Sequence, residues 1–162
     1  MTIRFDWCIK SSSTDMLLVH QDSLYIAENL VKEEGFESIH ITISDLDSAE
    51  DVFIKLMTSI PTNPNYLELH KSINYAALCD SLIGGIEDRD ICVILNGGDF
   101  VLSSSAGILF VIYEALCYAN NRRLMKRIKG RFKVILVGSS ENFFKIDDMT
   151  INLSRDSAFE NP

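Results

Sequence analysis

The stretch Asp90-Ile-Cys-Val-Ile-Leu-Asn-Gly-Gly-Asp99 decides the fold, because it places an apolar run directly before a glycine turn. The apolar part, Ile91 to Leu95, is nearly continuous, as in a strand that is covered on both faces. A second such run, Phe132-Lys-Val-Ile-Leu-Val137, follows a long apolar segment that predicts a helix from about Ala106 to Ala119. A strand, a helix and a second strand in this order imply a right-handed crossover between parallel strands. We therefore predict an α/β fold, a small parallel β-sheet packed with helices.

The segments on either side extend the same alternation of strands and helices. Apolar spacing and cap residues predict three further helices, and alternating or β-branched runs predict three short strands. The helices run from about Leu24 to Val31 with Gly35 as the stop, from a cap at Asp47 or Ser48 to Ile60, and from Asn74 to Ile83; the strand-like runs are Ile3 to Ile9, Ser38 to Ile43 and Met149 to Leu153. We expect one domain over residues 1–162, with an N-terminal strand-helix extension (1–35), a core (36–139) and a tail (140–162).

The composition excludes several classes of protein. Of 162 residues, 47% are apolar and 23% are charged, with 8 Gly and 3 Pro, which does not fit a disordered or collagen-like chain. The longest apolar run, Ala106 to Tyr113, is too short to cross a bilayer, so we expect no membrane partner. Asp6 and Trp7 stand where a secretory signal would need an uninterrupted apolar run. We expect a cytoplasmic protein whose four cysteines are reduced, since each lies inside an apolar stretch and none belongs to a Cys-x-x-Cys pair.

The charge is distributed unevenly along the chain. The net charge is −8, yet seven of the 15 basic residues fall between Arg122 and Lys133, where there is no acid. The rest of the chain carries 8 basic and 23 acidic residues, a formal charge of −15. Such a field repels nucleic acid and membrane surfaces and accelerates encounter with a basic partner, through steering that salt weakens.

The basic run from Arg122 to Lys133 could neutralise phosphates of a nucleic acid. It has few aromatic residues on which bases could stack, and the charge of the remaining chain opposes this binding. A helix C-terminus also favours cations, so we interpret the run as a solvated extension of the long helix. Contact with an acidic patch on another subunit is the alternative.

Residues with catalytic or metal-binding potential form no recognisable set. His20, His40 and His70 lie on separate segments, away from cysteines and carboxylates at ligand spacing, so we expect no metal and no other cofactor. Gly138-Ser-Ser140 follows a strand but lacks the Gly-x-Ser-x-Gly sequence of a nucleophile elbow. The turn Asn96-Gly-Gly-Asp99 stands where α/β proteins offer N–H groups to a phosphate. Without Gly-x-Gly-x-x-Gly or a Walker lysine, we interpret it as a tight turn.

Two acids are distinguished by their surroundings. In the helix predicted over residues 74–83, Leu78 and Leu82 belong to the core face, which turns Asp80 outward. Glu114 is the only charged residue in the long apolar helix, so it must lie on a narrow exposed stripe, with Tyr118 one turn further on. The pattern alone leaves open whether these are ordinary surface acids or binding residues.

The order of the elements and one helix motif together resemble the barstar family, intracellular inhibitors that shield a bacterium from its own secreted ribonuclease. The match spans about Phe36 to Ser139 and includes the motif Asn-x-x-Ala-Leu-x-Asp-x-Leu at Asn74 to Leu82, with a Gly behind it. In that family, acids of the motif helix and of the following long helix enter the ribonuclease active site, where RNA phosphates would lie. The resemblance implies that Asp80 and Glu114 have these two roles.

The resemblance places the partner-binding residues on the motif helix, on the loop before it and on the long helix. They are Asp80, Glu114, Ala76, Cys79, Ile83, Tyr66, Glu68, His70 and Tyr118. The chain departs from the family pattern at several of them. Ala76 replaces a second acid, Cys79 stands where an aromatic residue is common, and Glu68 and His70 replace a tyrosine-rich segment. The contacts with the partner are therefore expected to differ from those of the type member.

The expected function is that of an immunity protein without enzymatic activity. It would bind a basic toxin nuclease domain, a ribonuclease by resemblance, and block its substrate site without contacting nucleic acid directly. Two alternatives remain open: an interaction module of the same fold with no toxin partner, and a small phosphate-binding enzyme that uses the Asn96–Asp99 turn. Residues 1–35 either extend the sheet and cover one of its faces or form a self-association surface, which would make the protein a homo-oligomer.

Overall fold

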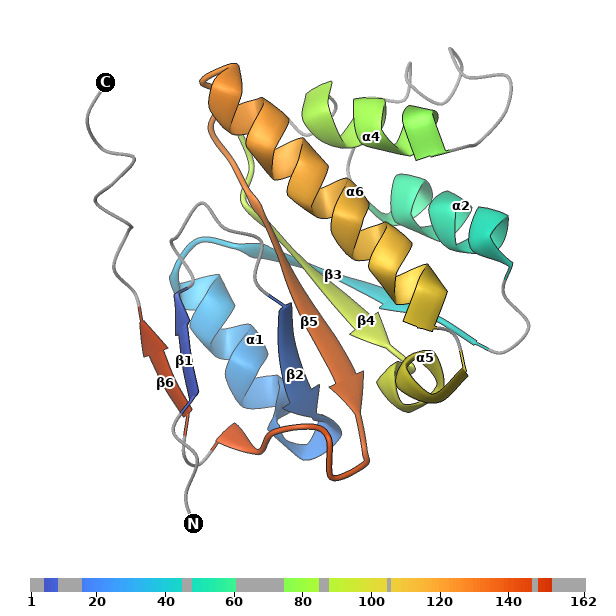
Figure 1. The fold of residues 1–162 in the computed structure, drawn as a ribbon. Helices are drawn as coiled ribbons and strands as arrows, with labels where there is room; N and C mark the ends of the chain where they lie inside the picture. The colour runs from blue at the N-terminus through green and yellow to red at the C-terminus, as the bar shows by residue number, and fades with distance from the viewer. Residues whose placement is uncertain are drawn as a thin grey trace.

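The computed structural model describes residues 5–8, 16–44, 48–60, 75–84, 88–104, 106–146 and 149–152. Within these ranges, four parallel strands form a sheet in the order β2-β5-β4-β3 (Figure 1). The strands are β2 (Met16–His20), β3 (Glu37–Thr42), β4 (Ile91–Asn96) and β5 (Phe132–Gly138). A separate parallel pair joins β1 (Phe5–Cys8) to β6 (Met149–Asn152). The prediction of an α/β fold with a small parallel sheet is confirmed.

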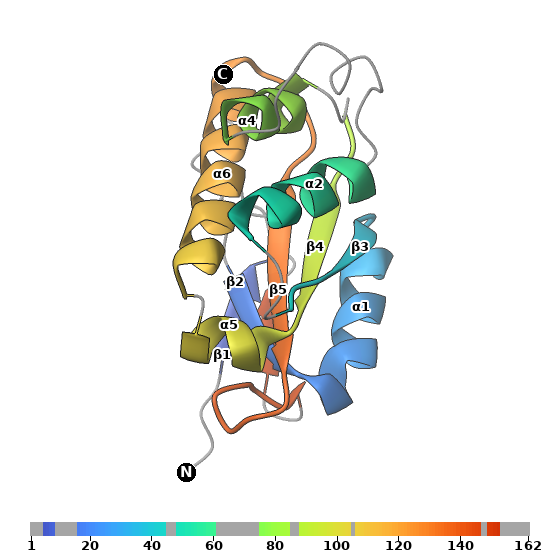
Figure 2. The ribbon, with the colours of Figure 1, turned by 90° about the vertical axis from the view of Figure 1, so that its right-hand side faces the viewer.

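Helices lie on both faces of this sheet, as the view in Figure 2 shows. One face is covered by α1 (Leu24–Glu33), which follows the short 3-10 helix η1 (Gln21–Ser23). The opposite face is covered by α2 (Ala49–Ser59), α4 (Tyr75–Gly84) and α6 (Ala106–Met125). Helix α5 (Gly98–Ser104) lies between β4 and α6 at the carboxyl end of β4.

The two central strands send alternate side chains into two separate cores. In β4, Val93 and Leu95 pack with α2, α4 and α6, whereas Cys92 and Ile94 pack with α1. Every residue of β5 is buried, and β4 is buried from Ile91 to Leu95. Burial on both faces is the reason that these strands are nearly continuous apolar runs in the sequence.

Strand β2 is the one strand of the main sheet without a sequence prediction. Its five residues are too few for periodicity to separate a strand from the start of the following helix. Leu17 and Val19 are buried in the core beneath α1, and the strand pairs with β5 along its length. Of the predicted strand Ile3 to Ile9, the structure describes Phe5–Cys8, which pairs with β6 instead of the main sheet. In the described part of the N-terminal extension, β2 and α1 extend the sheet and cover one face.

The long helix extends to Met125, as the interpretation of the basic run requires. The prediction that this run is solvated is wrong for Arg123 and Lys133, both of which are fully buried. Arg123 follows Leu116 and Ala119 at i+7 and i+4, so it lies on the buried side of α6. Helix α5 is a further difference, since it occupies residues that the sequence assigns to a turn and caps.

The ends of α1 and α2 follow the sequence predictions. Gly35, with a φ of +86°, ends α1 in a Schellman motif: its N–H donates to the Lys32 carbonyl, and the Phe36 N–H donates to the Val31 carbonyl, both at 3.0 Å. At the start of α2, the Ser48 side chain accepts the Asp51 N–H, and the Asp51 carboxylate accepts the Ser48 N–H, which completes a capping box.

Candidate functional site

Helix α4 presents Asp80 to solvent between two small residues. Ala76, Asp80 and Gly84 are exposed and follow one another at i, i+4 and i+8, so they form one stripe along the helix. Leu78 and Leu82 are buried on the opposite side. The predicted outward orientation of Asp80 is confirmed. Because only a methyl group and a hydrogen flank it on this stripe, the Asp80 carboxylate is open to close approach.

Helix α6 presents Glu114 between two exposed aromatic rings. Phe110 is 65% exposed and Tyr118 is 47% exposed, and with the exposed Glu114 they again follow at i, i+4 and i+8. Met125, which is 73% exposed, continues this side of the helix towards its C-terminus. The predicted exposure of Glu114 and Tyr118 is confirmed. Exposed aromatic residues and Met are enriched in protein interfaces, which distinguishes the surroundings of Glu114 from an ordinary surface.

The two exposed stripes belong to neighbouring helices. Helices α4 and α6 pack directly against each other on the same face of the sheet (Figure 1). Arg123 of α6 joins them, because its Nη1 donates to the Ile83 carbonyl at 2.7 Å. We call the two stripes, together with Met125, the α4–α6 face. Its residues are Ala76, Asp80, Gly84, Phe110, Glu114, Tyr118 and Met125.

Neither acid of the α4–α6 face has an ion-pair partner among the residues that the structure describes. Other surface acids do have such partners: Glu37 pairs with Arg89, and Asp22 lies 3.4 Å from the Lys145 amine. Asp80 and Glu114 are therefore available to a cation from outside the described chain. Chemically, the face is suited to binding cationic groups between apolar contacts.

The remaining predicted contact residues divide into two groups. Cys79 and Ile83 of α4 are buried in the core with Leu78 and Leu82, so we do not include them in the α4–α6 face. Tyr66, Glu68 and His70 lie outside the described residues.

Phe110 was missed in the sequence because an apolar residue within an apolar helix predicts a core position, and Met125 because it falls in the basic run, beyond the predicted helix. The spacing nevertheless contained the signal. Phe110 precedes Glu114 by four residues, so a stripe that exposes the charge must also expose this ring. Arg123 was missed for the converse reason, since charge alone favours a solvated position.

The glycines of the Asn96–Asp99 turn are required by packing within the chain. Gly97 has a φ of +96°, and a Cβ there would lie 2.2 Å from the Ile43 carbonyl oxygen. A Cβ on Gly98 would lie 2.7 Å from the ring of Phe143. Both positions therefore need glycine for close packing, Gly97 in the connection to α5 and Gly98 in the first turn of that helix, where the sequence predicted a turn.

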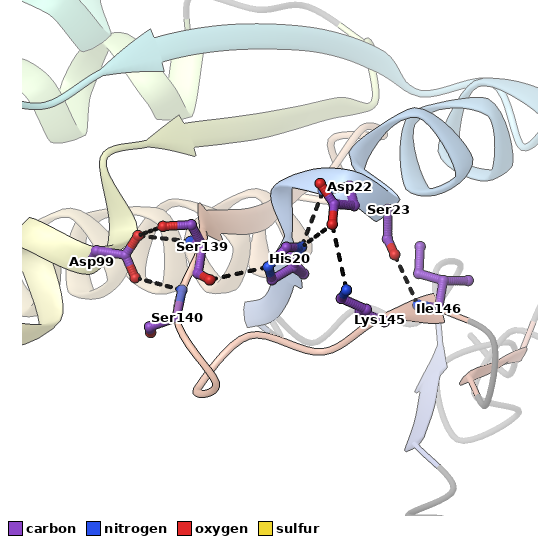
Figure 3. A network of polar contacts seen from close by, with 8 residues as sticks. All are labelled: His20, Asp22, Ser23, Asp99, Ser139, Ser140, Lys145 and Ile146. Atoms are coloured by element: carbon purple, nitrogen blue, oxygen red, sulfur yellow. Dashed lines mark hydrogen bonds and ion pairs between the residues drawn. The ribbon is translucent and has the colours of Figure 1, made fainter.

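Asp99 anchors the segment that follows β5 (Figure 3). Its carboxylate accepts the Ser139 N–H and hydroxyl, both at 2.7 Å, and the Ser140 N–H at 3.0 Å. These hydrogen bonds lower the pKa of Asp99 from 3.8 to about 2, with the Ser139 N–H as the largest contribution. His20 Nε2 lies 3.0 Å from the Ser139 carbonyl, and its Nδ1 accepts the Asp22 N–H. Because the Ser139 hydroxyl donates directly to Asp99, these residues do not have the serine–histidine–carboxylate order of a hydrolase triad.

The Asp99 contacts predict a pH-dependent stability. Because the pKa is depressed in the folded state, ionised Asp99 stabilises the fold above its unfolded value of 3.8, and the contribution is lost as the pH falls through about 2. Asp99→Asn is expected to lower the urea midpoint at neutral pH. The difference in midpoint from wild type should shrink as the pH falls from 3.8 to about 2. Urea unfolding over a pH series measures this, with the exposed Asp88→Asn as control. A difference that stays constant down to pH 2 would contradict the assignment.

Cys79, Cys92 and Cys117 form no disulfide. Burial is the main cause that raises the pKa of the Cys92 thiol, which disfavours its reactive thiolate. Among the described residues, no three His, Cys, Asp or Glu side chains converge as metal ligands would. In the same part of the chain, no helix has the length and apolar character needed to cross a membrane.

Comparison with known proteins adds no relative to this description. No family model matches the chain, and no curated protein is significantly similar to it in sequence.

Proposed function

We propose that this chain is an immunity protein that binds a cognate nuclease toxin and covers its substrate site with the α4–α6 face. The observation that carries the proposal is the pair of exposed acids on adjacent helices. Asp80 stands between Ala76 and Gly84, and Glu114 stands between Phe110 and Tyr118. Carboxylates so placed can occupy phosphate positions in a cationic active site, while the surrounding apolar groups exclude water.

The charge distribution supports this choice of partner. Outside the run from Arg122 to Lys133, the chain carries 8 basic and 23 acidic residues. A field of this sign attracts a cationic enzyme over distances of about a Debye length, and it accelerates association at low ionic strength. Rapid capture is an advantage for an inhibitor that must act before a nuclease reaches its substrate.

The order of elements supports a barstar-like core, which we propose for the segment from β3 to β5. A strand and a helix (β3, α2) are followed by the motif helix α4, a buried strand, a long helix and a final buried strand. We also propose that the protein acts in the cytoplasm, where an immunity protein meets a toxin that has entered the cell or has not yet left it.

The test is co-expression with the C-terminal domain of the protein encoded beside this one. We expect the two chains to purify as a complex and the nuclease activity of the toxin domain to fall to background at equimolar ratio. A non-cognate nuclease under the same conditions should remain active. A complex that keeps full nuclease activity would contradict the proposed function and favour an interaction module. Absence of any complex would show that the neighbouring protein is not the partner.

A further inference from the structure

The turn between α6 and β5 carries a cluster of exposed cations. Lys126, Arg127 and Lys129 are all exposed, and we call these three residues the basic turn. None of them has an ion pair with any residue that the structure describes. Their charge therefore faces solvent on a chain whose remaining surface is strongly anionic.

Two further arginines of the basic run hold the turn in place instead of facing solvent. The buried Arg123 donates through Nε to the Gly130 carbonyl and through Nη2 to the Lys129 carbonyl, in addition to its bond with Ile83. Arg131 Nη1 donates to the Ile128 carbonyl at 2.7 Å and to the Gly130 carbonyl at 2.6 Å. These hydrogen bonds satisfy the carbonyls of Ile128, Lys129 and Gly130 and hold the backbone that carries the exposed cations.

The backbone at position 127 has a conformation that favours glycine, yet the residue there is an arginine. Helix α6 ends in a Schellman motif, in which the Arg127 N–H donates to the Leu124 carbonyl and the Ile128 N–H donates to the Arg123 carbonyl. Arg127 occupies the left-handed position with a φ of 58°. The same motif at the end of α1 has Gly35 at this position. A side chain is disfavoured in this conformation, so the arginine at this position costs stability that glycine would not.

The basic turn continues the α4–α6 face. Along the exposed side of α6, the acid Glu114 is followed by Tyr118 and then by Met125. The cations of the basic turn come directly after Met125 in the sequence. At the helical rise, Met125 lies about 16 Å beyond Glu114. A partner that covers this side of α6 therefore meets an acidic group first and a cationic group about three turns later.

We propose that the basic turn is a second contact, which pairs with an acidic segment of the same toxin and fixes the orientation of the complex; this rests on the proposed function. An acidic segment is repelled by the anionic remainder of the chain, so this turn defines where it docks. No aromatic residue occurs from Met125 to Lys129 on which a nucleic acid base could stack, which favours an acidic protein segment over RNA.

The test compares toxin-domain binding by wild type and two variants of the full chain. Lys126→Glu with Lys129→Glu reverses two exposed charges, and we expect binding at about 0.05 M salt to weaken at least about tenfold, with a smaller effect at about 0.5 M. Arg127→Gly removes a cation and relieves the positive φ. It is expected to melt at the wild-type temperature or up to about 4 °C higher, yet to bind about two- to fivefold more weakly. Lys32→Glu, on the exposed C-terminal turn of α1, is the matched control.

Together, the outcomes distinguish a failure of this inference from a failure of the proposed function. If wild type binds and inhibits but the charge-reversal variant behaves like Lys32→Glu, the basic turn is not a contact and the proposed function stands. If wild type does not bind the toxin domain, both proposals fail. A labelled RNA oligonucleotide is tested alone in parallel, and binding that is lost on charge reversal would replace the acidic segment with RNA.

Discussion

Asp80→Ala is expected to weaken binding of the cognate toxin domain by about 2–5 kcal/mol while the fold remains unchanged. The carboxylate is exposed on α4, so its removal costs no packing in the free protein. In the complex, it is expected to lie against a desolvated lysine or arginine of the toxin, which is left without a partner in the variant. Isothermal titration or surface plasmon resonance measures the change, together with thermal unfolding of the free variant.

The same experiment with Glu114→Ala tests the second acid, for which we expect a loss in the same direction. Glu33→Ala is the control, because Glu33 is an exposed acid on α1, which covers the opposite face of the sheet. Asp80→Asn separates charge from shape and should lose most of what the alanine variant loses. A change below about 0.5 kcal/mol for Asp80→Ala would remove Asp80 from the interface, since exposed substitutions away from a contact fall in that range.

Arg123→Met is expected to have the largest effect on stability, a loss of about 3–5 kcal/mol in the free energy of unfolding. The buried guanidinium donates to the carbonyls of Ile83, Lys129 and Gly130, and all three lose a charged donor in the variant. Burial lowers the pKa of Arg123, and the charge of Arg131 acts in the same direction. The melting temperature should fall by on the order of 10 °C, as differential scanning calorimetry would show.

Arg123→Lys should recover little of this loss, because one ammonium group cannot reach three carbonyls in the planar arrangement that guanidinium provides. The exposed Lys126→Met serves as the control for removing a positive charge from the same run and should change stability little. A loss below about 1 kcal/mol for Arg123→Met would show that the arginine does not hold the end of α4 against α6.

The central part of the fold could be predicted from the sequence because burial on both faces produces an unmistakable pattern. Strands β4 and β5 are nearly continuous apolar runs, and the long helix α6 between them has no charge except Glu114 before its last turns. The edge strand β2 could not be predicted, since a run of five mostly apolar residues fits the start of a helix equally well. Pairing was also beyond the sequence, because nothing in Phe5–Cys8 specifies β6 as its neighbour.

The candidate site was predictable where a charge interrupts an apolar helix and unpredictable where context decides exposure. Asp80 and Glu114 follow from helical periodicity, which assigns each to the side opposite the core. The same rule applied to Arg123 gives a buried position, but a charged side chain is buried only if partners are available. Those partners are main-chain carbonyls of Ile83, Lys129 and Gly130, whose positions depend on the packing of α4 and the following turn.

Steady-state inhibition kinetics test the central claim, that the α4–α6 face blocks the substrate site of a nuclease, most directly. The toxin domain is assayed on RNA at several substrate concentrations with increasing amounts of the purified chain. We predict competitive inhibition, in which saturating RNA restores the maximal rate and the inhibition constant rises in Asp80→Ala by the same factor as the Kd. Inhibition that RNA does not relieve, in a complex unaffected by Asp80→Ala, would contradict the claim and place the interface on another face of the protein.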